Sequence, residues 1–117
     1  MTCTDPKVWL PLPVPVGSEY SLTVVGPPGT HSAFADYDDP APGPHVFWPP
    51  HTIDPGPRMQ PLTAVGVHVI ITTVTLNTPG TAIQVKAEIR EPGGTVRKYC
   101  RTVQNQVEKI VHAVRVA

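Results

Sequence analysis

Residues 83–94 read IQVKAEIREPGG, and this stretch decides the fold class of the chain. From Ile83 to Arg90, apolar side chains alternate with polar or charged ones, which is typical of a strand with one buried face. The Glu91–Gly94 segment then supplies the proline and glycines of a tight turn. We therefore expect an antiparallel hairpin here, whose second strand follows the turn.

The C-terminal segment, residues 95–117, is open to two interpretations. Apolar residues recur at intervals of four and three, which is a helical period. Val, Ile and Thr are frequent, however, and Gln104–Gln106 suits a turn. We expect two strands, Val96–Val103 and Val107–Val116, and an α+β fold with a C-terminal helix is the alternative.

The segment Leu62–Leu76, before the hairpin, is rich in β-branched residues and predicts one long strand. Its apolar alternation runs from Val65 to Ile71 and then changes phase, which indicates a bulge, a twist or burial on both faces. Asn77–Gly80 predicts a turn, with Pro-Gly at the central positions of type II. The spacing of this turn and the next one predicts a hairpin meander.

The N-terminal region predicts an arm and two further strands. Prolines at every second position between Val8 and Val16 leave few backbone donors, so residues 1–17 form an extended arm or an edge strand. Glu19–Val25 alternates like a half-buried strand and ends at the turn Gly26–Gly29. His31–Tyr37 is a candidate partner strand.

Eight of the sixteen prolines lie in DYDDPAPGPHVFWPPHTIDPGPRMQP, from Asp36 to Pro61. Proline fixes φ and removes a backbone donor, so this stretch is expected to be neither a helix nor a central strand. Phe47 and Trp48 within it predict an ordered loop, residues 38–61, that packs against another surface.

Together these elements predict one β domain, residues 1–117, whose main strand-rich scaffold is residues 62–117. The fold class that fits is a small antiparallel β-sandwich or barrel. The size of the chain suits a single core.

Composition and charge limit the partners. Charged residues make up only 15% of the chain, which suits a protein partly covered by neighbours. Residues 1–60 carry two basic and six acidic groups, and residues 61–117 carry seven basic and three acidic groups. This asymmetry is neutralised either within one subunit or between subunits. We expect no secretion signal or membrane span, and hence a location in a virion or the cytoplasm.

Cys3 and Cys100 are the two cysteines, and without a secretion signal we expect both to be free thiols. Cys100 and His112 are a conceivable nucleophile and base, but a thiol in a strand is usually a small buried hydrophobic group. No serine lies in a GxSxG turn. The chain is therefore not expected to be an enzyme.

A cluster of possible metal ligands surrounds the proline-rich stretch, but it lacks the compact spacing of a zinc or calcium motif, so we expect no metal and no other cofactor. The residues of this cluster are His31, Asp36, Asp38, Asp39, His45, His51 and Asp54.

Two surfaces are candidates for contact with other molecules. A basic face on the last strands has too little charge for a nucleic-acid site and fits a solvated or subunit-pairing role better; it comprises Arg90, Arg97, Lys98 and Arg101, with Tyr99 among them. A proline-rich and aromatic set is the candidate interface: Trp9, Pro11, Pro13, Pro15, Phe47, Trp48, Pro49 and Pro50.

The segments SEYSLTVVGPPGT and AIQVKAEIREPGGTVRKY resemble the short turn-linked strands of immunoglobulin-like modules in tailed-bacteriophage accessory and decoration proteins. This resemblance implies a non-enzymatic virion component. An extended arm preset by proline loses little entropy on docking, which fits such a role. The alternatives are a carbohydrate- or metal-binding β-module, which would use Trp9, Phe47 and Trp48 or the histidine and aspartate cluster, and a small enzyme.

Overall fold

The structure is a computed structural model that describes residues 3–10, 13–38, 47–52 and 58–117, with only the backbone described for residues 47–52 and 58–60. The described residues form strands, turns and bends, without any helix. Their strands are β1 (Val8–Trp9), β2 (Pro13–Val14), β3 (Ser18–Val25), β4 (His31–Asp38), β5 (Phe47–Thr52), β6 (Arg58–Leu62), β7 (Gly66–Leu76), β8 (Ile83–Arg90), β9 (Val96–Val103) and β10 (Val107–Val116).

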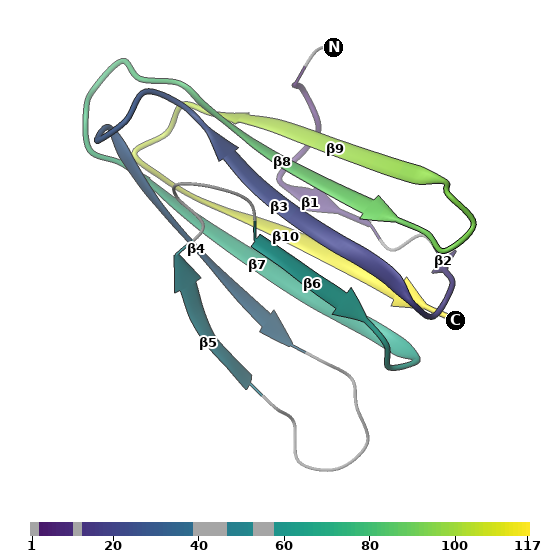
Figure 1. The fold of residues 1–117 in the computed structure, drawn as a ribbon. Coiled ribbons are helices and arrows are strands. Elements are labelled where there is room, and N and C mark those ends of the chain that lie inside the picture. Colours follow the sequence, from purple (N-terminus) through teal and green to yellow (C-terminus); the bar gives the residue numbers. More distant parts are fainter. Residues whose placement is uncertain (1–2, 11–12, 39–46, 53–57) are drawn as a thin grey trace.

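Two sheets pack as a sandwich that does not close into a barrel (Figure 1). The six-stranded sheet has the order β1-β10-β7-β4-β5, and β2 also pairs with β10. The four-stranded sheet has the order β6-β3-β8-β9. The prediction of a small β-sandwich is therefore confirmed.

The two C-terminal strands have the predicted bounds, so the C-terminal helix of the alternative fold is absent. The apolar residues at intervals of four and three do not share one buried face, because Val96 and Val107 are exposed whereas Cys100, Val103, Ile110 and Val114 are buried. The hairpin β8–β9 is also confirmed, and the turn hydrogen bond from Gly94 N to Glu91 O is 2.9 Å long.

The prediction for Leu62–Leu76 was wrong in two respects. The chain forms two strands here, since β6 ends at Leu62 and β7 begins at Gly66. The apolar side chains do change phase, but the buried face does not: one continuous face of β7 is buried, and the pairing of β7 with β10 shows no bulge. Val67, Val69 and Ile71 lie on the outer side, and the buried side chains are His68, Ile70, Thr72, Val74 and Leu76.

The predicted meander is wrong as well, because the turn after β7 carries the chain from one sheet to the other. The scaffold is larger than residues 62–117. Both β3 and β4 precede the proline-rich stretch, and each lies between two neighbouring strands of its sheet. The proline-rich stretch itself contributes β5 and β6 at two sheet edges, which agrees with its exclusion from central positions. Residues 39–46 and 53–57 of the predicted loop lie outside the described residues.

The core lies between the sheets and consists mainly of branched aliphatic side chains. Leu22, Ile83, Ile89, Ile110 and Val114 are among those with at most 2% exposure. Gly26 closes one end because a Cβ atom there would lie 2.6 Å from Ile83 Cγ2, so only glycine fits this turn.

Candidate docking surfaces

The N-terminal arm fastens the edges of both sheets on one side of the sandwich. Thr4 bridges Arg101 of β9, and the chain then crosses to β10, where β1 and β2 pair in parallel. Hydrogen bonds from Asp5 N to Cys100 O and from Thr102 N to Cys3 O hold the start of the arm on β9. Residues 1–17 were predicted to form an extended arm or an edge strand, and two short segments of this region, Val8–Trp9 and Pro13–Val14, pair with β10 at the edge of its sheet.

Cys3 and Cys100 form a disulfide, which corrects the prediction of two free thiols. The arm runs antiparallel to β9, which brings the two Cα atoms to 4.6 Å, within the range that a disulfide requires. Sequence spacing alone could not reveal this, because 97 positions separate the two residues. The disulfide also removes the Cys100 thiolate that a Cys100–His112 catalytic pair would need.

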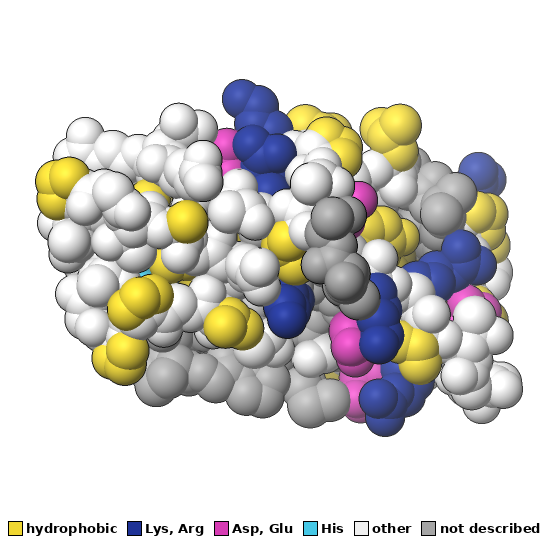
Figure 2. Space-filling view, turned by 90° about the horizontal axis from the view of Figure 1, so that it is seen from above, with side chains coloured by type: hydrophobic (Ala, Val, Ile, Leu, Met, Phe, Trp, Pro, Cys, Tyr) yellow, Lys and Arg dark blue, Asp and Glu magenta, His cyan; other side chains and the backbone are white. Residues whose placement is uncertain are grey.

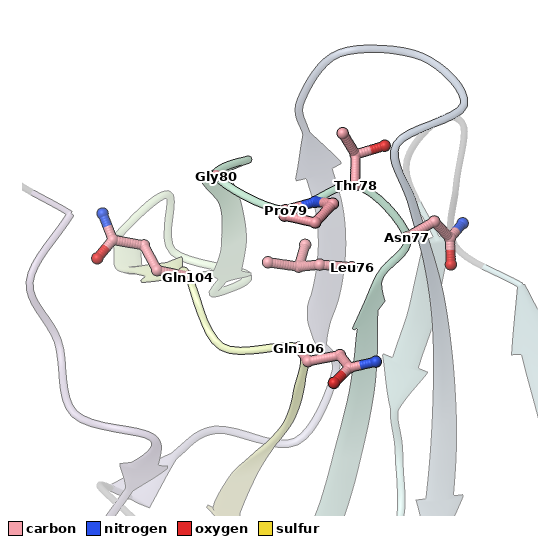
Figure 3. A pocket seen from close by; sticks show the side chains of 7 residues that line it. All are labelled: Leu76, Asn77, Thr78, Pro79, Gly80, Gln104 and Gln106. Carbon is pink, nitrogen blue, oxygen red and sulfur yellow. The ribbon is translucent and has the colours of Figure 1, made fainter.

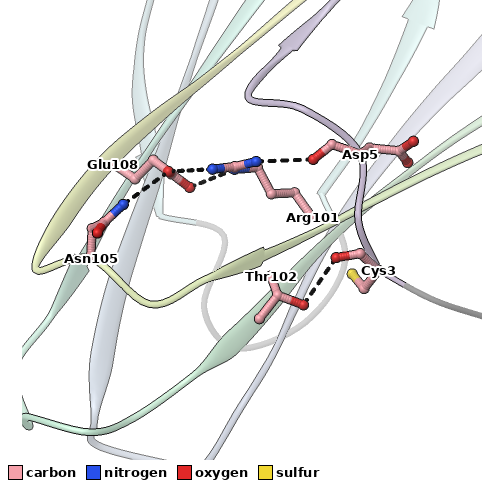
Figure 4. Close-up of polar contacts among 6 residues, drawn as sticks. All are labelled: Cys3, Asp5, Arg101, Thr102, Asn105 and Glu108. Atoms are coloured by element: carbon pink, nitrogen blue, oxygen red, sulfur yellow. Dashed lines mark hydrogen bonds and ion pairs between the residues drawn. The ribbon is translucent and has the colours of Figure 1, made fainter.

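A charged pair joins β9, β10 and the arm beside the disulfide (Figure 4). Arg101 donates from Nε and Nη2 to the two carboxylate oxygens of Glu108, each at 2.7 Å. Its Nη1 donates to Asp5 O at 3.0 Å, and Asn105 donates to Glu108 Oε1 at 3.3 Å. The Glu108 side chain is 5% exposed, and the hydrogen bonds from Arg101 hold its pKa below the ordinary value.

Trp9 lies in the core, 3% exposed, and is not part of an exposed contact surface. Its ring stacks on Tyr99 with a centroid distance of 5.3 Å and meets the edge of His112 at 4.9 Å. Tyr20 Oη lies 2.9 Å from His112 Nδ1. Burial raises the pKa of Tyr20, so its hydroxyl stays protonated and can donate to the imidazole. This cluster anchors the arm and takes Trp9 out of any carbohydrate platform.

Acid should weaken the fold through His112, which is 1% exposed. Burial lowers its pKa from 6.5 to about 4, so the folded protein keeps it neutral where the unfolded chain takes up a proton. Above about pH 6.5 His112 is neutral in both states and does not lower the free energy of unfolding. As the pH falls toward 4, protonation of His112 in the unfolded chain lowers the free energy of unfolding by at most about 3 kcal/mol. Urea unfolding of the wild type and of His112→Gln at pH 7, 6 and 5 measures this. With falling pH, the free energy of unfolding should decrease more steeply in the wild type than in His112→Gln, by up to about 1.4 kcal/mol per pH unit. Equal pH slopes in the two proteins would contradict the lowered pKa of His112.

The other residues of the predicted interface are distributed as follows. Pro13 and Pro15 are exposed at the edge beside β10. Pro11 lies outside the described residues. The backbones of the four others belong to edge strand β5, and their side chains lie outside the described part: Phe47, Trp48, Pro49 and Pro50.

The structure does not bring the predicted basic face together on one surface. Because side chains alternate along β9, Arg97 and Arg101 both point toward the arm. Arg97 also forms an ion pair, at 3.0 Å, with Glu91 of the turn between β8 and β9. Arg90 and Lys98 point outward from the four-stranded sheet, and Lys98 lies 3.9 Å from Glu88. Figure 2, seen from the side on which β9 lies, shows basic and acidic side chains next to one another. Mixed charges of this kind do not form the one-signed field that nucleic acid attracts.

A hollow of about 330 Å³ lies at one end of the sandwich, between the turn after β7 and the β9–β10 turn (Figure 3). It has no ionisable side chain, so it offers no general acid, base or charged nucleophile. Its lining is Leu76, Asn77, Thr78, Pro79, Gly80, Gln104 and Gln106.

Among the described residues, no three histidine, cysteine or acidic side chains lie close enough to hold a metal ion. His31, Asp36 and Asp38 of the predicted cluster are on β4, where His31 points into the core and the two aspartates point to the opposite, outer side. Asp39, His45, His51 and Asp54 lie in the part whose side chains are not described. The described part also contains no helix that could span a membrane.

The two outer faces of the sandwich differ in chemistry. The polar face, on the four-stranded sheet, presents mostly charged and amide or hydroxyl groups: Glu19, Ser21, Thr23, Gln84, Lys86, Glu88, Arg90 and Lys98, with Val25 and Val96 at its margins. The apolar face, on the six-stranded sheet, presents the apolar side chains Val8, Phe34, Val67, Val69, Ile71, Val107, Val111 and Ala113. Its hydroxyl side chains are Ser32, Thr73 and Thr75, and its charged ones are Asp36, Asp38, Lys109 and Arg115, of which Asp38 is half-buried.

The apolar face is the surface that reasoning from sequence missed. Its signal was the alternation from Val65 to Ile71, which we interpreted only as evidence of a strand. In the structure Phe34 is 43% exposed and Val67 46% exposed. Contiguous exposed apolar groups are typical of surfaces that contact proteins, membranes or ligands.

Comparisons with family models, with curated proteins and with solved structures find no match to this chain.

Proposed function

We propose that this protein is a non-enzymatic structural module that docks on neighbouring protein subunits, as an accessory or decoration component of a virion does. The observation that carries the proposal is the apolar face on the six-stranded sheet. A sheet with both faces apolar is typical of an inner layer, and here the second sheet covers only one of them.

Two further features support a structural role. The disulfide and the Arg101–Glu108 pair fasten the arm along one edge of each sheet, which opposes uncontrolled edge-to-edge pairing on that side of the sandwich. Disulfides persist in oxidising surroundings such as the surface of a virion, which agrees with an extracellular particle. The bacteriophage part of the proposal rests on the resemblance of residues 18–30 and 82–99 to phage accessory modules.

The test is sedimentation of a tagged chain from the cells that produce the particle. The wild type should sediment with particles in a sucrose gradient, because its apolar face is covered there. A double variant, Val69→Glu with Ile71→Glu, should remain at the top, because two buried carboxylates oppose docking. Thr23→Glu on the polar face is the matched control and should sediment like the wild type. A wild type that stays at the top of the gradient would overturn the proposal.

A further inference from the structure

The apolar face has the dimensions of a dimer interface. Its described part spans β10, β7 and β4, with 10, 11 and 8 residues, and the 2 residues of β1. At about 3.3 Å per residue and about 4.8 Å between strands, this is on the order of 500 Å² of sheet. Stable protein interfaces bury about 600 to 1,000 Å² on each partner, so the face is near the lower end of the size that a dimer needs.

The charges of this face lie at opposite sides of β7. Lys109 and Arg115 are exposed on β10, on one side, and Asp36 is exposed on β4, on the other. No described residue forms an ion pair with any of these three. The ion pairs among the described residues join groups of residues 61–117 only: Arg97–Glu91, Lys98–Glu88 and Arg101–Glu108. The acidic first half of the chain is thus not neutralised by these pairs.

Two twofold axes place this face against its own copy with the strands of the two copies aligned, and they have different electrostatic consequences. An axis across the strands puts β10 over β10 and β4 over β4, so that like charges meet. An axis parallel to β7 puts β10 of one copy over β4 of the other. Lys109 pairs with Thr73, and Thr73 pairs with Phe34, so Lys109 of the second copy then lies over Phe34. Asp36 is the next outward residue of β4, about 7 Å along the strand and within reach of a lysine side chain.

We propose that two copies of this chain pack apolar face against apolar face about a twofold axis parallel to β7, with Asp36 of each copy beside Lys109 of the other. The proposal deepens the docking function and rests on it, since it names the partner as a second copy. Apolar contact supplies the affinity, and the two symmetric charge pairs fix the orientation.

The first test is the dimer dissociation constant, measured by sedimentation equilibrium. Asp36→Lys and Lys109→Asp should each weaken the dimer by at least about tenfold, because each places like charges together twice. The double variant exchanges the two charges, so its dimer dissociation constant should return to within about threefold of the wild-type value. Both positions are exposed, so these variants should fold normally, and urea unfolding checks this. A double variant as weak as the single ones would contradict the pairing.

The second test distinguishes the two axes. Thr75 lies on the outer side of β7, four residues from Ile71 near the middle of the face. The proposed axis brings the two copies of Thr75 together, whereas the axis across the strands separates them by about 26 Å. A short bismaleimide should therefore cross-link Thr75→Cys into a dimer, but not Thr23→Cys on the polar face. Equal cross-linking of both would overturn the geometry.

The outcomes separate this proposal from the docking function. A chain that is monomeric at all concentrations but sediments with particles has a different partner on this face, which rejects self-pairing and leaves the docking function intact. A chain that forms the predicted dimer but never sediments with particles supports the self-pairing and rejects the virion role.

Discussion

Replacing Cys3 and Cys100 together by serine should lower the free energy of unfolding by about 4 to 5 kcal/mol, the largest effect expected in this chain. The disulfide closes a loop with a sequence separation of 97, so it restricts the unfolded chain strongly. On the chain-entropy model the stabilisation grows with the logarithm of loop length, and this loop is near the upper end. The backbone hydrogen bonds between the arm and β9 remain in the variant, so the arm should still dock.

Urea unfolding with and without a reductant measures this effect. Reductant should destabilise the wild type by the same amount as the double substitution and should not affect the serine variant. A loss below about 1 kcal/mol would mean that the disulfide adds little to an arm held by its other contacts.

Glu108→Gln should lower the free energy of unfolding by about 2 to 3 kcal/mol. Breaking a fully buried ion pair by removing one partner costs about 3 to 5 kcal/mol. The Arg101 side chain keeps 24% exposure, so water screens part of the charge that remains. Glu88→Gln is the matched control, because the Glu88–Lys98 pair has exposed fractions of 42% and 56% and should contribute less than about 1 kcal/mol.

A double variant tests whether the effect comes from the unpaired charge. Arg101→Met with Glu108→Leu removes both charges, and such replacements are often neutral or stabilising, so it should be more stable than Glu108→Gln. The pKa of Glu108 is lowered by hydrogen bonds from Arg101, so the contribution of the pair is complete above the ordinary carboxyl pKa and is lost as the pH falls through the lowered value. A double variant less stable than Glu108→Gln would assign the pair a net stabilising role.

Much of the fold could be predicted from the sequence because strand alternation depends on local chemistry. The bounds of β9 and β10 and the turn at Glu91–Gly94 follow from the residues themselves. Sheet assignment could not be predicted in this way. The turn after β7 has a hairpin sequence, yet it connects the two sheets, and only tertiary packing decides between these outcomes.

The candidate surface was harder to predict because alternation does not say which face is inside. Both sides of β7 carry apolar residues. The inner side also holds one histidine, His68, and one threonine, Thr72. His68 is accommodated because its Nδ1 lies within hydrogen-bonding distance of Tyr37 Oη and its Nε2 lies 2.6 Å from Ala64 O. The contact with Tyr37 that helps to make His68 acceptable in the core comes from 31 positions away, so the sequence around β7 does not show which of its two sides faces inward.

Hydroxyl-radical footprinting of the assembled protein tests the central claim, that a neighbouring protein covers the apolar face. Phe34 on the apolar face and Val25 on the polar face have similar exposed fractions in a single chain, 43% and 47%. The labelling of each residue in the assembly is compared with the labelling of the same residue in the dilute monomer, so the intrinsic reactivity of the side chain cancels. We predict that assembly protects Phe34 several-fold and leaves Val25 unchanged, whereas equal labelling of Phe34 before and after assembly would contradict the claim.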